Sequence, residues 1–148
     1  LLVTRSNTEP LLGHAAIYSG EPFPCIYPDL IMRLKVDSQK AETRFVYYWL
    51  RTPEVRARIQ KAGRGTSSSM KKITQKHVMG LPFPVAVGLD EQRVVVGELD
   101  EIVSRIERAQ SVQRDRSREL VALMPSLLDT AFQGELDVSD AAIAVAAN

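Results

Sequence analysis

The residues best suited to chemistry in this chain form a basic stretch that leads into a loop of small polar residues. Eight lysines and arginines lie between Arg51 and Lys76, against one acid, Glu54. The cationic and hydroxyl groups at and around the loop are Arg64, Thr66, Ser67, Ser68, Ser69, Lys71 and Lys72. Such groups, with free backbone N–H groups, are the usual donors to phosphate oxygens. The stretch is suited to contact with a polyanion, but taken alone it is better interpreted as a solvated helix face followed by a flexible surface connector.

The distribution of charge is uneven, and by itself it fits a solvated basic helix face better than a polyanion site. The whole chain carries a net charge of only +1. Residues 1–84 hold 13 basic and 6 acidic side chains, a net charge of +7, whereas residues 85–148 hold 6 basic and 12 acidic ones, a net charge of −6. A basic region within a near-neutral chain is typical of proteins that bind nucleic acid.

Nothing in the sequence indicates catalysis. His14, His77 and Cys25 are separated from one another, so no metal-ligand spacing occurs. The Gly/Ser loop lacks the Gly-Lys-Ser/Thr ending of a phosphate-binding P-loop, and no Gly-x-Ser-x-Gly nucleophile motif is present. We therefore expect no catalytic residue, no metal and no cofactor of the chain's own, and no turnover by the purified protein.

The elements that must position the basic stretch are short strands and helices. We expect strands at Leu1–Arg5, at His14–Tyr18 and, by period-two alternation, from Cys25 to Val36, and a helix at Glu42–Leu50. A second helix should begin after Thr52-Pro53 and end at Gly63. Its inner face is Val55, Ile59 and Ala62, so Arg56, Arg58 and Lys61 should point outward. A helical turn at Lys76–Met79 and an extended segment, restricted by Pro82 and Pro84 to a sheet edge, complete this part.

A long helix dominates the remainder. Residues recur at alternating spacings of four and three along one seam, which is apolar except at Gln113 and Arg116 and consists of Val95, Leu99, Ile102, Ile106, Ala109, Gln113, Arg116, Leu120, Leu123 and Leu127. Asp90–Met124 would form a rod of about 50 Å, which needs a partner surface along the seam. We expect Pro125 to kink the rod or to begin a second short helix, Ser126–Gln133.

The predicted fold class is therefore α+β, with a small mixed domain followed by one coiled-coil-type helix. We divide the chain into a domain at residues 1–84, a helical region at residues 85–136 and a disordered tail at residues 137–148. No apolar run reaches the ~20 residues that a membrane span needs, and no secretory signal is visible. Cys25 is the single cysteine. We expect a cytoplasmic protein, and the strand-like start without Met leads us to expect a fragment of a longer chain.

Several motifs are similar to those of a known family. Their order is Gly65-Thr66, Ile73, Leu81-Pro82-Phe83-Pro84, then Glu91-Gln92-Arg93-Val94-Val95 and the ending Ser126–Leu136, with Thr4-Arg5-Ser6-Asn7 and Tyr48-Trp49-Leu50 as supporting pieces. The chain thereby resembles the specificity subunits of type I restriction–modification enzymes. Pro125 departs from the uninterrupted helix expected there, and the chain is shorter than such a subunit.

The resemblance implies a role in DNA recognition. Such subunits carry two target-recognition domains, each reading half of a split site, and long conserved helices that pair antiparallel. Partner subunits supply the methyltransferase, which uses S-adenosylmethionine, and the endonuclease, which uses ATP and magnesium. The expected partners are thus double-stranded DNA, the modification and restriction subunits, and a second conserved helix or a second copy. In this reading Arg5 and Asn7 can read base edges in the major groove, while the loop holds phosphates.

Two alternatives stay open. The chain could be a coiled-coil adaptor whose basic patch meets an acidic protein, without any nucleic acid. It could also be the recognition segment of a single-chain restriction–methylation enzyme, in which case methyltransferase motifs would lie upstream in the full gene.

Overall fold

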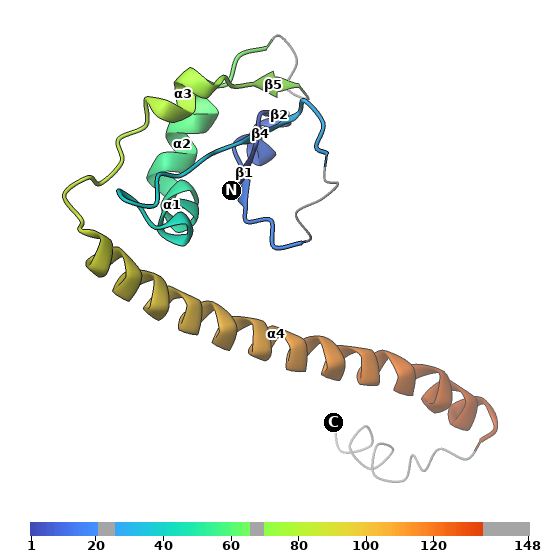
Figure 1. Cartoon of the computed structure of the whole chain (residues 1–148). Coiled ribbons are helices and arrows are strands. Elements are labelled where there is room, and N and C mark those ends of the chain that lie inside the picture. The colour runs from blue at the N-terminus through green and yellow to red at the C-terminus, as the bar shows by residue number, and fades with distance from the viewer. Residues whose placement is uncertain (21–25, 66–69, 135–148) are drawn as a thin grey trace, which may run out of the picture. The chain divides into compact units, whose positions relative to one another are not determined.

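The computed structural model describes residues 1–20, 26–65 and 70–134, and Figure 1 shows the chain. The elements, in order, are β1 (Leu2–Thr4), β2 (Ser6–Asn7), the 3₁₀ helix η1 (Glu9–Leu11), β3 (Ala15–Ala16), β4 (Ile31–Arg33), α1 (Thr43–Leu50), α2 (Pro53–Ala62), β5 (Lys71–Lys72), α3 (Gln75–Met79) and α4 (Leu89–Phe132). Small antiparallel sheets and a long helix confirm the predicted α+β class.

The larger sheet has three antiparallel strands in the order β3-β1-β4. Its central strand places Val3 opposite Met32 on one side and opposite Ala15 on the other. The strands are shorter than the alternation predicted: β4 covers Ile31–Arg33 only, and Cys25 lies outside the described residues. The ladder stops because β1 offers three residues for pairing, and only Leu34 N continues it, by donating to Leu1 O at 2.9 Å.

One compact core joins this sheet to the helices of the first part. Its buried members are Val3, Leu12, Met32, Ala41, Val46, Leu50, Val55, Ile59, Ile73 and Val78. Val55 and Ile59 confirm the inner face expected of α2, and Gly63 is the residue that ends this helix. Gly13, at φ +71°, packs so closely on α2 that an added Cβ would lie 2.3 Å from Ile59 Cγ2. The glycine thus lets the turn before β3 contact the helix directly.

The segment with Pro82 and Pro84 is not the edge strand that we expected. It forms no strand, and its apolar side chains pack on the core instead. The Phe83 ring makes edge-to-face contacts with Phe45 and Trp49, with centroids 6.0 and 5.1 Å away. These ring contacts hold the segment on the core, and its two prolines leave few N–H groups for a strand ladder.

The long helix α4 runs from Leu89 to Phe132, which corresponds to about 66 Å. Pro125 lies inside it, so the helix assignment continues where we expected a second helix to begin. Proline has no N–H to donate to Val121 O, so the helix continues past this position with one backbone hydrogen bond fewer. The expected tail at residues 137–148 lies outside the described residues.

The chain divides into two compact units, Leu1–Asp100 and Glu101–Asn148. The first turns of α4 therefore belong to the first unit. The division that we predicted near residue 85 stays a prediction.

Candidate nucleic-acid interface

The structure brings the predicted phosphate-binding cations onto a small two-stranded ribbon. β2 and β5 pair antiparallel, with Ser6 opposite Lys72 and Asn7 opposite Lys71, and Figure 1 shows the two strands side by side. Arg64 extends the ribbon, because its N and O atoms bond to Lys72 O and N at 2.9 and 2.8 Å. Residues some 60 positions apart in the sequence thereby become neighbours. We call residues 6–7, 64–65 and 71–72 the basic ribbon.

At one end of the basic ribbon, the close approach of residue 65 to Met70 requires a glycine. Lys71 Nζ donates to Gly65 O at 3.1 Å. Gly65 has φ +149°, and an added Cβ would lie 2.5 Å from Met70 O, so a larger residue does not fit. Arg64 and Lys72 are exposed, and Lys71 is half-buried. The predicted contacts Thr66, Ser67, Ser68 and Ser69 lie outside the described residues.

Asn7 is in the ribbon, but half of its amide is already used. Its Oδ1 atom accepts a hydrogen bond from Thr8 N at 2.8 Å. A bidentate contact with adenine needs both the oxygen and the nitrogen of the amide. Asn7 therefore has its Nδ2 group to offer without rearrangement. Next to it, the Ser6 hydroxyl is buried and has no hydrogen-bond partner among the described residues.

The basic face of α2 differs from the prediction. Arg56 does not point outward: it is half-buried, and its guanidinium donates to Leu12 O and, at 2.7 Å, to Pro10 O. Burial lowers the pKa of Arg56. Arg58 is exposed but lies 3.0 Å from the Glu54 carboxylate on the same helix. The spacing of apolar residues along α2 did not predict this position of Arg56, because a long side chain can reach back to carbonyl groups beside the core.

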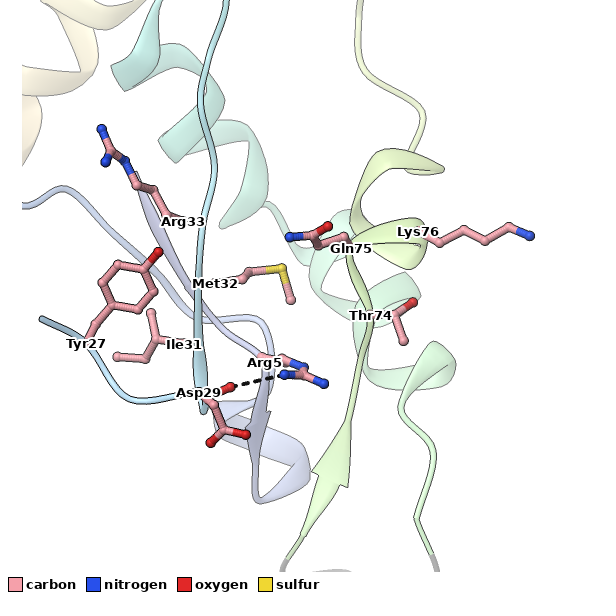
Figure 2. Close-up of a pocket in the computed structure, with 9 residues that line it drawn as sticks. All are labelled: Arg5, Tyr27, Asp29, Ile31, Met32, Arg33, Thr74, Gln75 and Lys76. Atoms are coloured by element: carbon pink, nitrogen blue, oxygen red, sulfur yellow. Dashed lines mark hydrogen bonds between the residues drawn. The ribbon is translucent and has the colours of Figure 1, made fainter.

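A polar groove of about 490 Å³ adjoins the ribbon, and Figure 2 shows its lining. One wall is formed by the chain around β4 and the other by the start of α3, and the lining residues are Arg5, Tyr27, Asp29, Ile31, Met32, Arg33, Thr74, Gln75 and Lys76. Arg5 is the predicted base-reading residue, and it lies between Asp29 and Thr74 in Figure 2.

Sequence reasoning missed the α3 contribution to this groove. We treated residues 76–79 only as a helical turn, yet α3 begins at Gln75, and Thr74 N donates to His77 Nδ1 at 3.2 Å. A threonine followed three residues later by a polar side chain is a helix-start signal, and it could have placed Gln75 and Lys76 on the first turn.

The start of α4 is held to the first unit by a residue that we did not single out. Gln92 is 1% exposed. Its Oε1 atom accepts from Glu42 N at 2.9 Å, and its Nε2 atom donates to Val87 O at 2.8 Å. Nearby, the Asp100 carboxylate accepts from Tyr48 Oη and, at 2.6 Å, from the Arg44 guanidinium. Burial and the Asp100 hydrogen bond raise the pKa of Tyr48.

The exposure of the predicted helix-pairing seam changes along its length. Val95 and Leu99 are half-buried and, with Phe45, Tyr48 and Trp49, line an apolar hollow of about 320 Å³ in the first unit. Ile102 and Ile106 are each 50% exposed, and Leu120, Leu123 and Leu127 are at least as exposed. Pairing of this seam with another helix stays a prediction.

The described residues contain neither a cluster of metal-binding side chains nor a helix suited to crossing a membrane. No group of three or more His, Cys, Asp or Glu side chains within residues 1–20, 26–65 and 70–134 could hold a metal ion. No helix in the described part of the chain has the length and apolar character needed to cross a membrane. The expectation that the chain is not an enzyme stays a prediction.

Two comparisons with known proteins found no match. No protein-family model matches the chain, and no curated protein matches it. The resemblance to specificity subunits therefore depends on the motifs alone.

Proposed function

We propose that this chain recognises double-stranded DNA as the specificity subunit of a type I restriction–modification complex. In that role it directs partner methyltransferase and endonuclease subunits to a split site. The observation that carries the proposal is the basic ribbon, where Arg64, Lys71 and Lys72 come together beside Asn7. The motif resemblance given above supplies the choice of family.

The two-stranded part of the ribbon, β2 and β5, has a width that duplex DNA can take. Neighbouring strands lie about 4.8 Å apart, and the major groove of B-DNA, about 12 Å wide, admits a two-stranded ribbon. Lysine and arginine at its edges would then lie near the phosphates that line the groove. Such contacts fix position and register but carry no sequence information directly.

The test is the salt dependence of binding to duplex DNA. Changing Lys71 and Lys72 together to Ala should lower the slope of log affinity against log salt by about two, because each phosphate contact contributes about 0.9. Affinity should fall alike on all sequences. The matched control changes Arg105 and Arg108 to Ala, which removes the same charge from exposed positions on α4. If both double variants keep the parental slope, the ribbon does not hold phosphates.

The exposed seam of α4 favours a second candidate, a coiled-coil adaptor without a nucleic-acid role. Ile102 and Ile106 are half-exposed on a helix of 44 residues, as expected for a surface that pairs with a partner. A chain that associates through α4 but shows no salt-dependent binding to any duplex would support the adaptor and overturn DNA recognition.

A further inference from the structure

The polar groove beside the basic ribbon has Arg5 as its floor. The main chain of Arg5 is fixed to both walls: its N atom donates to Leu30 O at 2.7 Å, and its O atom accepts from Ile73 N at 2.9 Å. Its side chain is exposed. Because the backbone bridges the two walls, the side chain emerges between them, and Nη1 lies 3.4 Å from Asp29 O. Figure 2 shows this contact at the lower end of the lining residues.

The groove is positively charged on balance. Arg5, Arg33 and Lys76 contribute cations, and Asp29 is the only acid among the lining residues that the structure describes. In Figure 2 the Asp29 carboxylate points away from Arg5, while Lys76 extends outward from α3 on the side away from Arg5. Thr74 and Gln75 add a hydroxyl and an amide to the α3 wall. A polar hollow with cations at its floor and its rim suits a phosphate-bearing strand.

The shape of the groove decides which part of a duplex it can take. Base edges lie at the bottom of the DNA's own major groove, about 8.5 Å deep, so they are read by elements that protrude from a protein. A side chain on the floor of a hollow cannot reach them in an intact duplex. The sugar–phosphate backbone, by contrast, is the convex part of the DNA surface, and a concave groove receives it.

We propose that this groove holds the sugar–phosphate backbone of one DNA strand, with Arg5 as the phosphate contact at its floor and Lys76 at its rim. The assignment rests on the proposed function. It moves Arg5 from base reading, which the sequence suggested, to backbone binding. Base reading then falls to the neighbouring ribbon, which enters the major groove while the adjacent strand lies in the hollow.

The assignment is tested with the full chain on two probes, a fixed duplex titrated with salt and a randomised duplex library. Changing Arg5 to Ala should lower the salt slope by about one and reduce affinity by the same factor on every sequence, so the selected sequences stay those of the parent. Arg5→Lys should keep the slope, because lysine binds a phosphate as a point charge. Lys76→Ala, at an exposed position, should repeat the effect of Arg5→Ala.

Arg105→Ala on α4 is the matched control, and a thermal melt followed by Trp49 fluorescence shows that each variant is folded. Folded Arg5→Ala protein that keeps the slope but selects different sequences would make Arg5 a base-reading residue and overturn the assignment. Unchanged affinity and slope in both Arg5→Ala and Lys76→Ala would overturn it as well, while leaving DNA recognition by the ribbon intact. A parent that binds no duplex in a salt-dependent way would instead remove the proposed function itself, and the groove assignment with it.

Discussion

Replacing Gln92 with Ala should destabilise the first unit severely, although Gln92 is a polar residue on a helix with many exposed polar neighbours. The side chain is 1% exposed and connects α4 to two other segments, through Glu42 N at 2.9 Å and Val87 O at 2.8 Å. A third contact, from Nε2 to Lys40 O, has a length of 3.5 Å and contributes little. Truncation removes both strong hydrogen bonds and leaves their partners without a donor or acceptor.

The size of the effect follows from those partners. A buried donor or acceptor left unsatisfied costs about 1–3 kcal/mol. Glu42 N and Val87 O are partly buried rather than fully buried, so the lower half of that range applies to each. The free energy of unfolding should therefore fall by about 2–4 kcal/mol, a large share of the ~5–15 kcal/mol that holds a typical domain. At ~1–3 kcal/mol per molar urea, the unfolding midpoint should move by about 0.7–4 M.

Urea unfolding followed by tryptophan fluorescence measures this change. Trp49 is the only tryptophan, and its ring packs on Phe83, so its emission reports on the first unit. Gln110→Ala is the matched control, because Gln110 is exposed on the same helix and lies outside the predicted seam. A Gln92→Ala midpoint within experimental error of the control would refute the reasoning, since it would mean that the start of α4 is not held by this residue.

Two further predictions concern recognition and association. Asn7→Ala should change which duplex sequences are selected from a randomised library while leaving the salt slope unchanged, and an unchanged selection would show that Asn7 does not contact bases. Ile106→Asp should dissociate a self-dimer formed through α4, because it places an unpaired charge in the seam at a cost beyond the ~2–5 kcal/mol of truncating a buried apolar residue. Sedimentation equilibrium measures this against Ser104→Asp, an exposed position off the seam. A monomeric parent, or an Ile106→Asp variant that stays dimeric, would show that the interface lies elsewhere.

The parts of the fold that the sequence could predict are those that depend on local periodicity. The inner face of α2, at Val55 and Ile59, follows from a spacing of four residues, and α4 follows from its long seam. The ribbon could not be predicted in this way. β2 and β5 have two residues each, and no pattern in residues 6–7 indicates a partner at residues 71–72. Their register is set by tertiary packing, which is why the candidate site emerged only with the structure.

The sequence also did not indicate which polar residues would be buried. Gln92 belongs to the motif Glu91-Gln92-Arg93, but a glutamine on a helix is ordinarily solvated. Nothing in the neighbouring sequence indicates that its amide will bond to Glu42 and Val87. Arg56 was misplaced for the same reason. Its partners are carbonyl groups of the turn around Pro10 and Leu12, which no spacing along α2 can indicate.

These internal partners change how the basic stretch should be understood. From the sequence alone the eight cations were treated as equivalent. In the structure, some of them bind other groups of the protein, and others are exposed. Arg56 binds carbonyl groups of the first unit, Arg58 lies beside Glu54, and Arg51 bonds to the Tyr47 hydroxyl. Exposed cations that face the candidate interface therefore lie mainly after α2, on the ribbon and at the groove. Loss of charge at Arg56 should then act chiefly on stability, and loss of charge at Arg64, Lys72 or Lys76 on binding. The predicted polyanion site is thus narrower than the basic stretch, and it lies where two strands and one short helix meet.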